Sequence, residues 1–292
     1  MLIGGASGLI GSALVDAFAS AGSEVVRLVR RGPQSASEMA WDPMRPVPPK
    51  LVSGFDAVIH LSGESVAGRW TRAKKRRIRD SRVVSSENLA RALTLAERKP
   101  SVLISASAVG YYGDRGDEVL TEASAAGEGF LAAVCREWES ATNSASLAGI
   151  RVVHLRTGLV LSPRGGALAQ MLVPFRWGLG GRIGSGRQWW SWIHGDDLVA
   201  AVFDILEHRD LGGAVNMVSP NPVSNAEFSQ TLAHILRRPA IFPVPEFVVR
   251  LAFGEFAKEG LLSSAKVFPA RLSQAGFHFR YPALEMALKN LV

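Results

Sequence analysis

Three glycines near the start of the chain stand at a spacing that suits the binding of phosphate groups. The segment reads Gly4-Gly5-Ala6-Ser7-Gly8-Leu9-Ile10-Gly11. In such a loop one glycine permits a tight turn, a second lets the backbone approach a pyrophosphate, and a third lets helix pack on strand. The helix then presents unpaired N–H groups and the positive end of its dipole to the phosphates. We therefore predict that a dinucleotide contacts Gly5, Ser7, Gly8, Leu9, Ile10 and Gly11.

Two arginines, Arg30 and Arg31, follow the apolar run that should form the second strand. Proteins that bind NAD typically carry an acidic residue here, which would repel a 2′-phosphate. A guanidinium group instead binds phosphate through two parallel hydrogen bonds. The pair therefore favours NADP(H) over NAD as the cofactor, and it leaves open that one of the two arginines is ordinary surface charge.

The elements that would hold these residues follow a regular alternation over the first 160 residues. Short β-branched runs are expected to form strands at 2–3, 24–29, 57–61, 102–105 and 152–155. Apolar residues at three- and four-residue spacing predict helices at 10–21, 83–97 and 129–148. This alternation is typical of a doubly wound parallel sheet of the Rossmann type, covered by helices on both faces.

The pattern changes after residue 160. Glycines and tryptophans crowd residues 178–192, and helices are expected at 196–207 and 225–236. We predict a Rossmann domain over residues 1–160 and a smaller, mainly helical lobe over 161–292, with chain crossing between the two. This second lobe should supply the substrate side and close over the cofactor.

Composition limits the partners that the chain can have. Of its 292 residues, 47% are hydrophobic and 20% charged, as in a globular enzyme. The net charge is +7, and eight of the fourteen residues at 69–82 are basic. That segment is either a solvated helix face or a source of phosphate contacts, and no recognition motif accompanies it that would indicate nucleic acid.

Cellular location is judged from two further features. Cys135 is the only cysteine, so no internal disulfide can form, which favours a reducing compartment. No run approaches the roughly 20 apolar residues of a membrane-spanning helix. We therefore expect a cytoplasmic protein with no membrane and no nucleic-acid partner.

Several motifs give the chain a family resemblance. The spacing GxxGxxG resembles that of extended short-chain dehydrogenases/reductases, and so do the segments 56–63, 104–108 and 192–197. More closely, the chain is similar end to end to an atypical branch whose members are called epimerase family proteins. The motifs of that branch lie at 70–74, 81–83, 105–113, 174–189, 261–263 and 275–279. The resemblance implies a Rossmann domain, NADP(H) binding and a nominal epimerase or reductase activity.

The same resemblance implies further contacts with the cofactor. Leu61, Ser62 and Gly63 would line the adenosine half. Arg82 stands where ordinary extended members carry an asparagine, and it is either a cofactor contact or part of a surface salt bridge. Arg156 would face the nicotinamide end.

The proton relay of such reductases is missing. They use a tyrosine activated by a lysine four residues later on the same helix face. In this chain the two positions fall near Leu131 and Cys135. The resemblance offers Ser107, Tyr111 and Tyr112 as replacements, against the alternative that all three only pack.

Two functions remain open from the sequence. One is an oxidoreductase or epimerase that acts on a small carbonyl or sugar-like substrate. Trp189, Trp190 and Trp192 either form a wall of its pocket or only pack at the interface between the lobes. The other is a redox-inert NADP(H) sensor that acts through a protein partner. No spacing of ligand residues indicates a metal.

Overall fold

The computed structural model describes all 292 residues, and a seven-stranded parallel sheet forms its centre. The strand order is β11-β7-β5-β4-β1-β2-β3, and every neighbouring pair is parallel. The bounds of the strands are β1 (Leu2–Gly4), β2 (Val26–Val29), β3 (Glu38–Ala40), β4 (Ala57–His60), β5 (Val102–Ala108), β7 (Arg151–Thr157) and β11 (Gly213–Met217). The order reverses direction at β1, which is the doubly wound arrangement of a Rossmann fold and confirms the predicted fold class.

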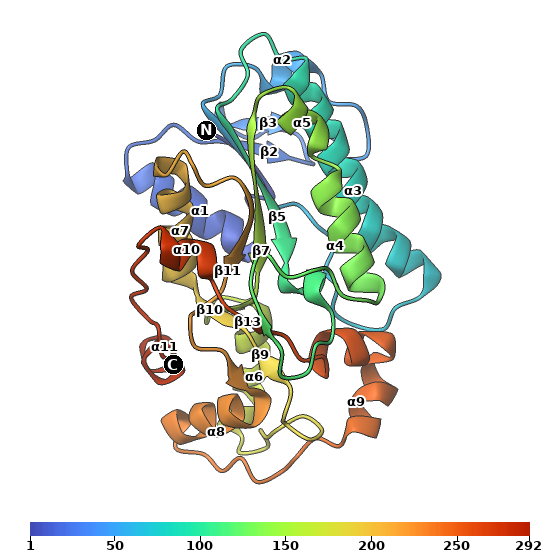
Figure 1. The fold of residues 1–292 in the computed structure, drawn as a ribbon, viewed down its shortest axis with the longest axis vertical. Helices are drawn as coiled ribbons and strands as arrows, with labels where there is room; N and C mark the ends of the chain where they lie inside the picture. The colour runs from blue at the N-terminus through green and yellow to red at the C-terminus, as the bar shows by residue number, and fades with distance from the viewer.

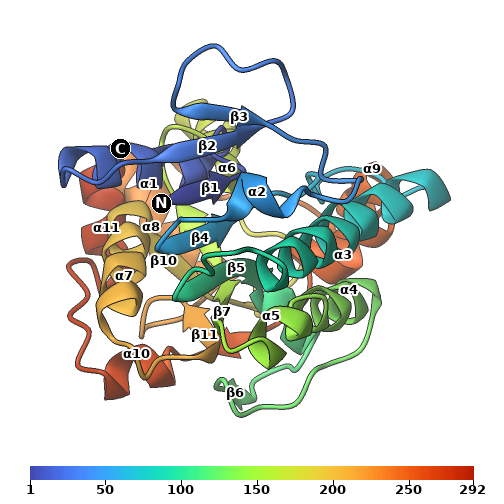
Figure 2. The same ribbon diagram turned by 90° about the horizontal axis from the view of Figure 1, so that it is seen from above.

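Helices cover both faces of the sheet (Figures 1 and 2). On one face α1 (Leu9–Ser20) and α7 (Gly195–Glu207) pack against each other, with α10 (Ala270–Gln274) beside β11. On the other face lie α2 (Pro49–Val52), α3 (Arg72–Thr94), α4 (Phe130–Ser140) and α5 (Asn143–Leu147). Two separate cores of buried apolar side chains fill these layers, one on each side of the sheet.

The second lobe packs below the carboxyl ends of the strands, at the lower end of the molecule in Figure 1. Its helical elements are α6 (Gly166–Arg176), α8 (Asn225–Leu236), α9 (Glu246–Phe253), η2 (Ala257–Leu261) and α11 (Leu284–Leu291). Two short strand pairs join it to the first lobe: β8 (Leu159–Leu161) with β10 (Trp192–His194), and β6 (Val119–Leu120) with β13 (Lys266–Val267). A third pair, β9 (Trp189–Trp190) with β12 (Val223–Ser224), lies within the second lobe. The short helix η1 (Val109–Tyr112) follows β5.

Three elements differ from what the sequence indicates. Helix α3 begins at Arg72 instead of residue 83, because the Thr71 hydroxyl accepts the Lys74 N–H at 3.1 Å and caps it. The expected helix over 129–148 is interrupted between α4 and α5. Residues 195–217 return to the sheet as α7 and β11, so both lobes contain chain from beyond residue 160.

None of the helices combines the length and the apolar character that crossing a bilayer would require.

Candidate functional site

A large cavity separates the carboxyl edge of the sheet from the second lobe. Its volume is about 1570 Å³, and 27 of its 48 lining residues are hydrophobic. The sheet contributes residues at the ends of β1, β4, β5 and β7, and the second lobe contributes parts of α6, β9 and η2. Ligands bind at this edge in doubly wound folds, because the crevice opens where the strand order reverses.

The glycine loop forms one end of the cavity. Gly5 has a left-handed φ of +80°, and a Cβ there would lie 2.7 Å from the Leu61 carbonyl carbon. A Cβ on Gly11 would overlap the carbonyl oxygen of Gly5, so α1 can approach β1 only through glycine. Gly8 differs, because its nearest neighbour would be the Gly5 oxygen at 3.4 Å. Its open side faces the cavity, which it lines together with Gly5, Leu9, Ile10 and Gly11.

The start of α1 carries no group that competes with an anion. Gly8 is the N-cap and makes no side-chain cap, and the first turn contains no acidic residue. The first N–H groups of a helix have no partner within it. Ser7 is exposed at the same turn and lies outside the cavity lining. Backbone donors and the dipole therefore point into the cavity without a counter-charge.

The two predicted phosphate-binding arginines differ in their surroundings. Arg31 donates from Nη1 and Nη2 to the two carboxylate oxygens of Glu38, each at 2.9 Å. These hydrogen bonds lower the pKa of the Glu38 carboxyl, and Arg27 lies 3.2 Å from the same group. Arg30 is exposed and has no carboxylate within 4.0 Å. Only Arg30 therefore has an unpaired guanidinium, and neither arginine lines the cavity.

The segment after β4 forms the neighbouring wall. Leu61 lines the cavity, whereas Ser62 and Gly63 lie outside its lining. A Cβ on Gly63 would lie 3.1 Å from Cζ of Arg82, so the backbone here supports that guanidinium. At the end of β4 itself, His60 is fully buried, and burial lowers its pKa to about 4.

Arg82 lines the cavity from α3, and no carboxylate lies within 4.0 Å of it. Its Nη1 donates to the carbonyl oxygens of Glu64 at 2.9 Å and Ile78 at 3.0 Å. Its guanidinium also lies over the Trp138 ring, 5.1 Å from the centroid. Burial lowers the pKa of Arg82, which shows that its charge is poorly solvated. A buried charge without a counter-ion is costly, and one that lines a cavity is a candidate for ligand binding.

Helix α4 is the helix on which the family resemblance places the missing tyrosine and lysine, near Leu131 and Cys135. Leu131 and Cys135 both line the cavity there. Burial raises the pKa of the Cys135 thiol to about 12. Neither side chain can exchange a proton near neutral pH, so the usual relay has no equivalent on this helix.

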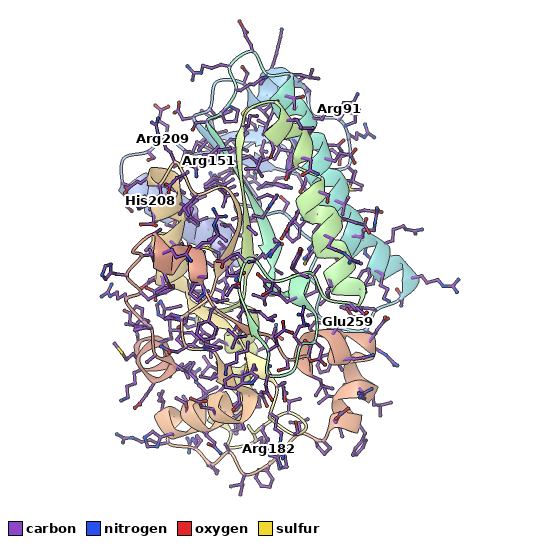
Figure 3. All side chains as sticks on the ribbon, in the orientation of Figure 1. Arg91, Arg151, Arg182, His208, Arg209 and Glu259 are labelled. Atoms are coloured by element: carbon purple, nitrogen blue, oxygen red, sulfur yellow. The ribbon has the colours of Figure 1, made fainter.

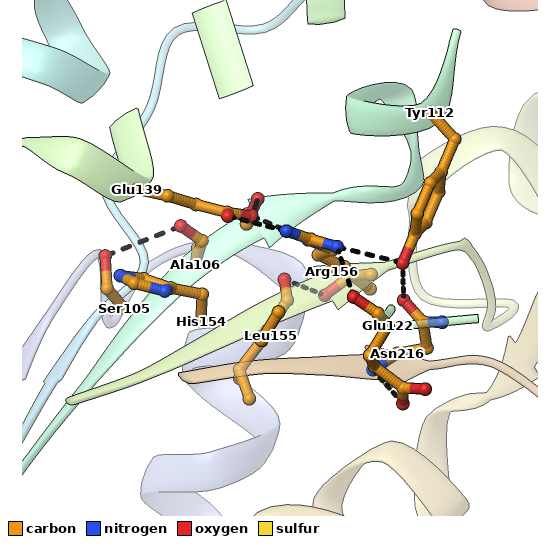
Figure 4. Close-up of polar contacts among 12 residues, drawn as sticks. Ser105, Ala106, Tyr112, Glu122, Glu139, His154, Leu155, Arg156 and Asn216 are labelled. Atoms are coloured by element: carbon orange, nitrogen blue, oxygen red, sulfur yellow. Dashed lines mark hydrogen bonds and ion pairs between the residues drawn. The ribbon is translucent and has the colours of Figure 1, made fainter. Parts of the chain in front are cut away.

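A buried polar cluster lies behind this wall (Figure 4). Arg156 donates to both carboxylate oxygens of Glu139 at 2.8 Å, and from Nη1 to the Tyr112 hydroxyl at 3.0 Å. The Tyr112 hydroxyl in turn donates to Asn216 at 2.7 Å. The Ser107 hydroxyl donates to the same Glu139 carboxylate at 2.7 Å. The hydrogen-bonding groups of the cluster thus satisfy one another.

Three of the expected site residues, Tyr111, Tyr112 and Arg156, lie outside the cavity lining. Tyr112 is fully buried, Tyr111 stacks on Arg156 at 3.4 Å from its ring centroid, and neither tyrosine lines the cavity. Burial raises the pKa of Tyr112. Arg156 also lies outside the lining, because its guanidinium is used within the cluster. Of the expected catalytic residues, only Ser107 reaches the cavity.

One contact across the cavity has no counterpart in the sequence analysis. Glu259 of η2, labelled in Figure 3, lies near the lower end of α4. Its carboxylate accepts the backbone N–H of Phe130 at 3.1 Å and that of Leu131 at 2.8 Å. A carboxylate from the second lobe thereby caps α4 of the first. Trp189 and Trp190 line the cavity, whereas Trp192 is buried in the core of the second lobe.

The structure contains no cluster of three or more His, Cys, Asp or Glu side chains that could hold a metal ion.

Comparison with known proteins places the chain among named relatives. The model of the NAD-dependent epimerase/dehydratase family matches residues 1–218, and a domain of unknown function, DUF1731, matches residues 244–291. Epimerase family protein Mb2239 of Mycobacterium bovis is 45% identical over 98% of this chain and 95% of its own length. The chloroplastic homologue of epimerase family protein SDR39U1 from Arabidopsis thaliana is 37% identical over 99% of this chain and 85% of its own. The crystal structure of human SDR39U1 (isoform 2) with NADPH superposes with a TM-score of 0.89 at 33% identity, covering 99% of this chain and 98% of that one.

Proposed function

The chain belongs to the NAD-dependent epimerase/dehydratase family, and we propose that it binds NADP(H) and acts as an oxidoreductase or epimerase on a small carbonyl or sugar-like substrate. The observation that carries the proposal is the uncapped start of α1 beside Gly8, where the backbone leaves room for a pyrophosphate. A phosphate group bound at such a helix start receives N–H donors and a favourable dipole. The human relative of similar fold was crystallised with NADPH, which supports the same choice here.

Selection for the 2′-phosphate would depend mainly on Arg30. Its guanidinium is exposed and unpaired, so it can turn toward a phosphate without breaking an ion pair. Arg31 is held by Glu38 and would add positive charge from a fixed position. Gly5, Ser7, Leu9, Ile10 and Gly11 would hold the pyrophosphate with Gly8, and Leu61, Ser62 and Gly63 would border the adenosine.

The catalytic end would work differently from that of a tyrosine–lysine reductase. When bound, the nicotinamide exchanges a hydride with a carbon atom of the substrate. Arg82 would hold the substrate oxygen or the nicotinamide ribose and stabilise negative charge on it. Ser107 lines the cavity at the end of β5 and would position the substrate by accepting a hydrogen bond, because its hydroxyl proton is donated to Glu139. We assign no proton transfer to Tyr112 or Arg156, because their polar groups bond each other. We assign none to Tyr111 either, because it lies outside the cavity lining, and water would supply the proton.

A second candidate function is a redox-inert sensor of NADP(H) that acts through a protein partner. The observation in its favour is the pair Leu131 and Cys135, which removes a titrating donor from the cavity wall. A protein that only reports cofactor binding needs no such donor. The two functions differ in whether bound NADPH is ever oxidised by a second ligand of the cavity.

We also propose a reducing compartment, such as the cytoplasm, as the location of this chain. Cys135 is buried and free, which suits such a compartment but does not require it. The plant relative is described as chloroplastic, and the location need not be the same across the family.

Calorimetric titration with NADPH and NADH tests the cofactor assignment. We expect tight binding of NADPH, and a loss of roughly tenfold or more in Arg30→Ala, since a charge-assisted phosphate contact contributes about 1.5–3 kcal/mol. The weaker affinity for NADH should not change in this variant, and Arg31→Ala should lose less. Arg91→Ala, an exposed arginine near the end of α3, is the matched control. Equal affinity for both nucleotides would refute the 2′-phosphate assignment, and binding of neither would refute the proposed function.

A further inference from the structure

Helix α9 is barely packed against the rest of the protein. Of its eight residues only Val249 is buried. Phe247 is 71% exposed and Leu251, one turn later on the same face, is 72% exposed. A helix of this length is not stable in water by itself, and an apolar face needs something to cover it.

The exposed apolar surface extends beyond this helix. Nine of the fourteen large hydrophobic residues that are exposed in the whole chain fall within residues 173–179 and 241–253, which we call the apolar lip. The two segments are held together, because the Val244 N–H donates to the Arg182 carbonyl at 2.8 Å and Gly178 lies against Pro239. Their most exposed members are Trp177, at 79%, and the α9 pair. Exposed apolar residues gathered in this way mark an interaction surface.

The apolar lip borders the cavity. Pro174 from α6 and Phe253 from α9 are exposed to solvent and also line the cavity. Whatever covers the lip would therefore lie at the cavity entrance.

Unpaired arginines lie next to the apolar lip. The residues that directly follow α9 contact the start of α3, because Lys75 contacts Glu255 at 2.5 Å and Arg69 lies against Gly254. Arg69, Arg72 and Arg76 are exposed there without a carboxylate within 4.0 Å. The nearby acidic groups are already neutralised, Glu255 by Lys75 and Glu246 by Arg250 at 2.7 Å. The surface is thus apolar at its centre and positive at its edge.

We propose that the apolar lip docks on an anionic lipid surface, with Phe247 and Leu251 inserted among the acyl chains and Arg69, Arg72 and Arg76 facing the head groups. Shallow insertion of an amphipathic helix combined with attraction of basic side chains is how peripheral proteins bind such membranes. Electrostatic repulsion disfavours a second copy of the chain as the partner that covers the apolar lip. A symmetric contact through this face would bring the arginines of both copies together, and each chain has a net charge of +7. Docking of this kind needs no spanning helix, and the structure has none.

Sedimentation of the full chain with vesicles tests the proposal. We expect binding to phosphatidylcholine vesicles that contain phosphatidylglycerol and little binding to phosphatidylcholine alone. Phe247→Ser/Leu251→Ser should weaken the binding roughly tenfold or more through lost apolar burial. Arg69→Glu/Arg72→Glu/Arg76→Glu should weaken it on the order of a hundredfold. Leu147→Ser, which removes a residue 89% exposed on α5, should change nothing.

Calorimetric titration with NADPH shows that each variant is folded and separates this inference from the cofactor assignment. Absence of binding to anionic vesicles would overturn the proposal, and so would equal binding by the Phe247→Ser/Leu251→Ser variant. A dimer in light scattering that this variant abolishes would instead assign the apolar lip to a second copy. Retention on nucleic acid with no binding to vesicles would assign the arginines to a different partner.

Discussion

The two ends of the cavity are built from different parts of the chain. At the glycine loop the walls are backbone: Gly5 and Gly11 touch neighbouring main chain, and the donors are helix N–H groups. At α4 the walls are side chains, where Leu131 and Cys135 stand in place of a proton relay. Where main-chain atoms form the wall of a site, few residues other than glycine fit. Where side chains form the wall, one residue can be substituted without changing the others. The comparison indicates that cofactor binding is kept by the fold while the chemistry at α4 has changed.

The polar groups near the α4 end are arranged for stability more than for reaction. Arg156 has its charge neutralised by Glu139 and its remaining donor directed to Tyr112. Burial lowers the pKa of Arg156, but the hydrogen bonds to Glu139 outweigh it and raise the value above the ordinary one. The four predictions below test whether stability and cofactor binding separate between the two ends.

The largest effect is expected at the α4 end, from Glu139→Gln. The substitution leaves Arg156 buried without a counter-charge, which typically lowers the free energy of unfolding by about 3–5 kcal/mol. Chemical denaturation measures the change, and NADPH affinity of the folded fraction should stay within a factor of about two, because the glycine loop is untouched. Should the single variant not fold, Glu139→Gln/Arg156→Met removes both charges and should regain most of the loss. A double variant as unstable as the single one would show that the ion pair is not the cause.

The next effect concerns pH and a residue near the glycine-loop end. His60 lies behind the loop, and a Cβ on Gly4 would be 3.0 Å from its Nδ1. Its pKa is about 4 when folded, below the ordinary 6.5, because burial disfavours the charged ring. Between these values the unfolded chain binds the proton more tightly, so the free energy of unfolding falls as pH drops. The free energy of unfolding is unaffected above pH 6.5 and reaches its full decrease, about 3 kcal/mol, below pH 4.

Urea denaturation across this pH window measures that slope. His60→Gln should reduce the slope by up to one proton, and His154 and His194, whose pKa values burial also lowers, should account for the rest. His278→Gln, at an exposed position, is the matched control. An unchanged slope in His60→Gln would assign the acid sensitivity to another buried group, such as His154, whose pKa is also lowered by burial.

Substitutions of Gly8 and Gly11 should affect stability and NADPH binding differently. Gly11→Ala places a methyl group against the Gly5 carbonyl oxygen and should cost about 1–3 kcal/mol of stability as well as NADPH affinity. Gly8→Ala has 3.4 Å to its nearest neighbour, so the fold accepts it. We expect Gly8→Ala to keep its melting temperature and yet to bind NADPH roughly tenfold or more weakly, since the methyl group enters the phosphate space. Gly32→Ala, with nothing within 4 Å, is the control. Full NADPH affinity in Gly8→Ala would place the pyrophosphate elsewhere.

The same contrast explains how much could be predicted from the sequence. The glycine loop and the five inner strands are local patterns, since the residues that define each one are neighbours in the chain. The Rossmann sheet and its helices follow from their alternation. The start of α3 was placed too late, because basic residues fill its first turns and hide the apolar period, although Thr71 offers a cap.

The side-chain contacts of the α4 end could not be predicted in the same way. Tyr112 is fixed by Asn216, which lies 104 residues later, and α4 is capped by Glu259, which lies 128 residues beyond Leu131. Such partners are brought together only by the complete fold. The sequence places both tyrosines next to a strand that ends at the cavity, but it does not show that the Tyr112 hydroxyl bonds Asn216 or that the Tyr111 ring stacks on Arg156.

The smallest effect is expected at Arg82, and it is the one that best distinguishes the α4 end of the cavity from the glycine-loop end. If Arg82 contacts the cofactor or substrate oxygen, Arg82→Met should weaken NADPH binding by roughly tenfold, the effect of one charged hydrogen bond. Its stability should change by less than about 1 kcal/mol, because relief of a poorly solvated charge offsets the two lost hydrogen bonds to backbone. Arg82→Lys keeps the charge and should recover part of the affinity. Calorimetry and thermal melting on the three proteins measure both quantities. A less stable Arg82→Met with unchanged NADPH affinity would make Arg82 a support for the Glu64 backbone, and the α4 end would then lack any charged group suited to reaction.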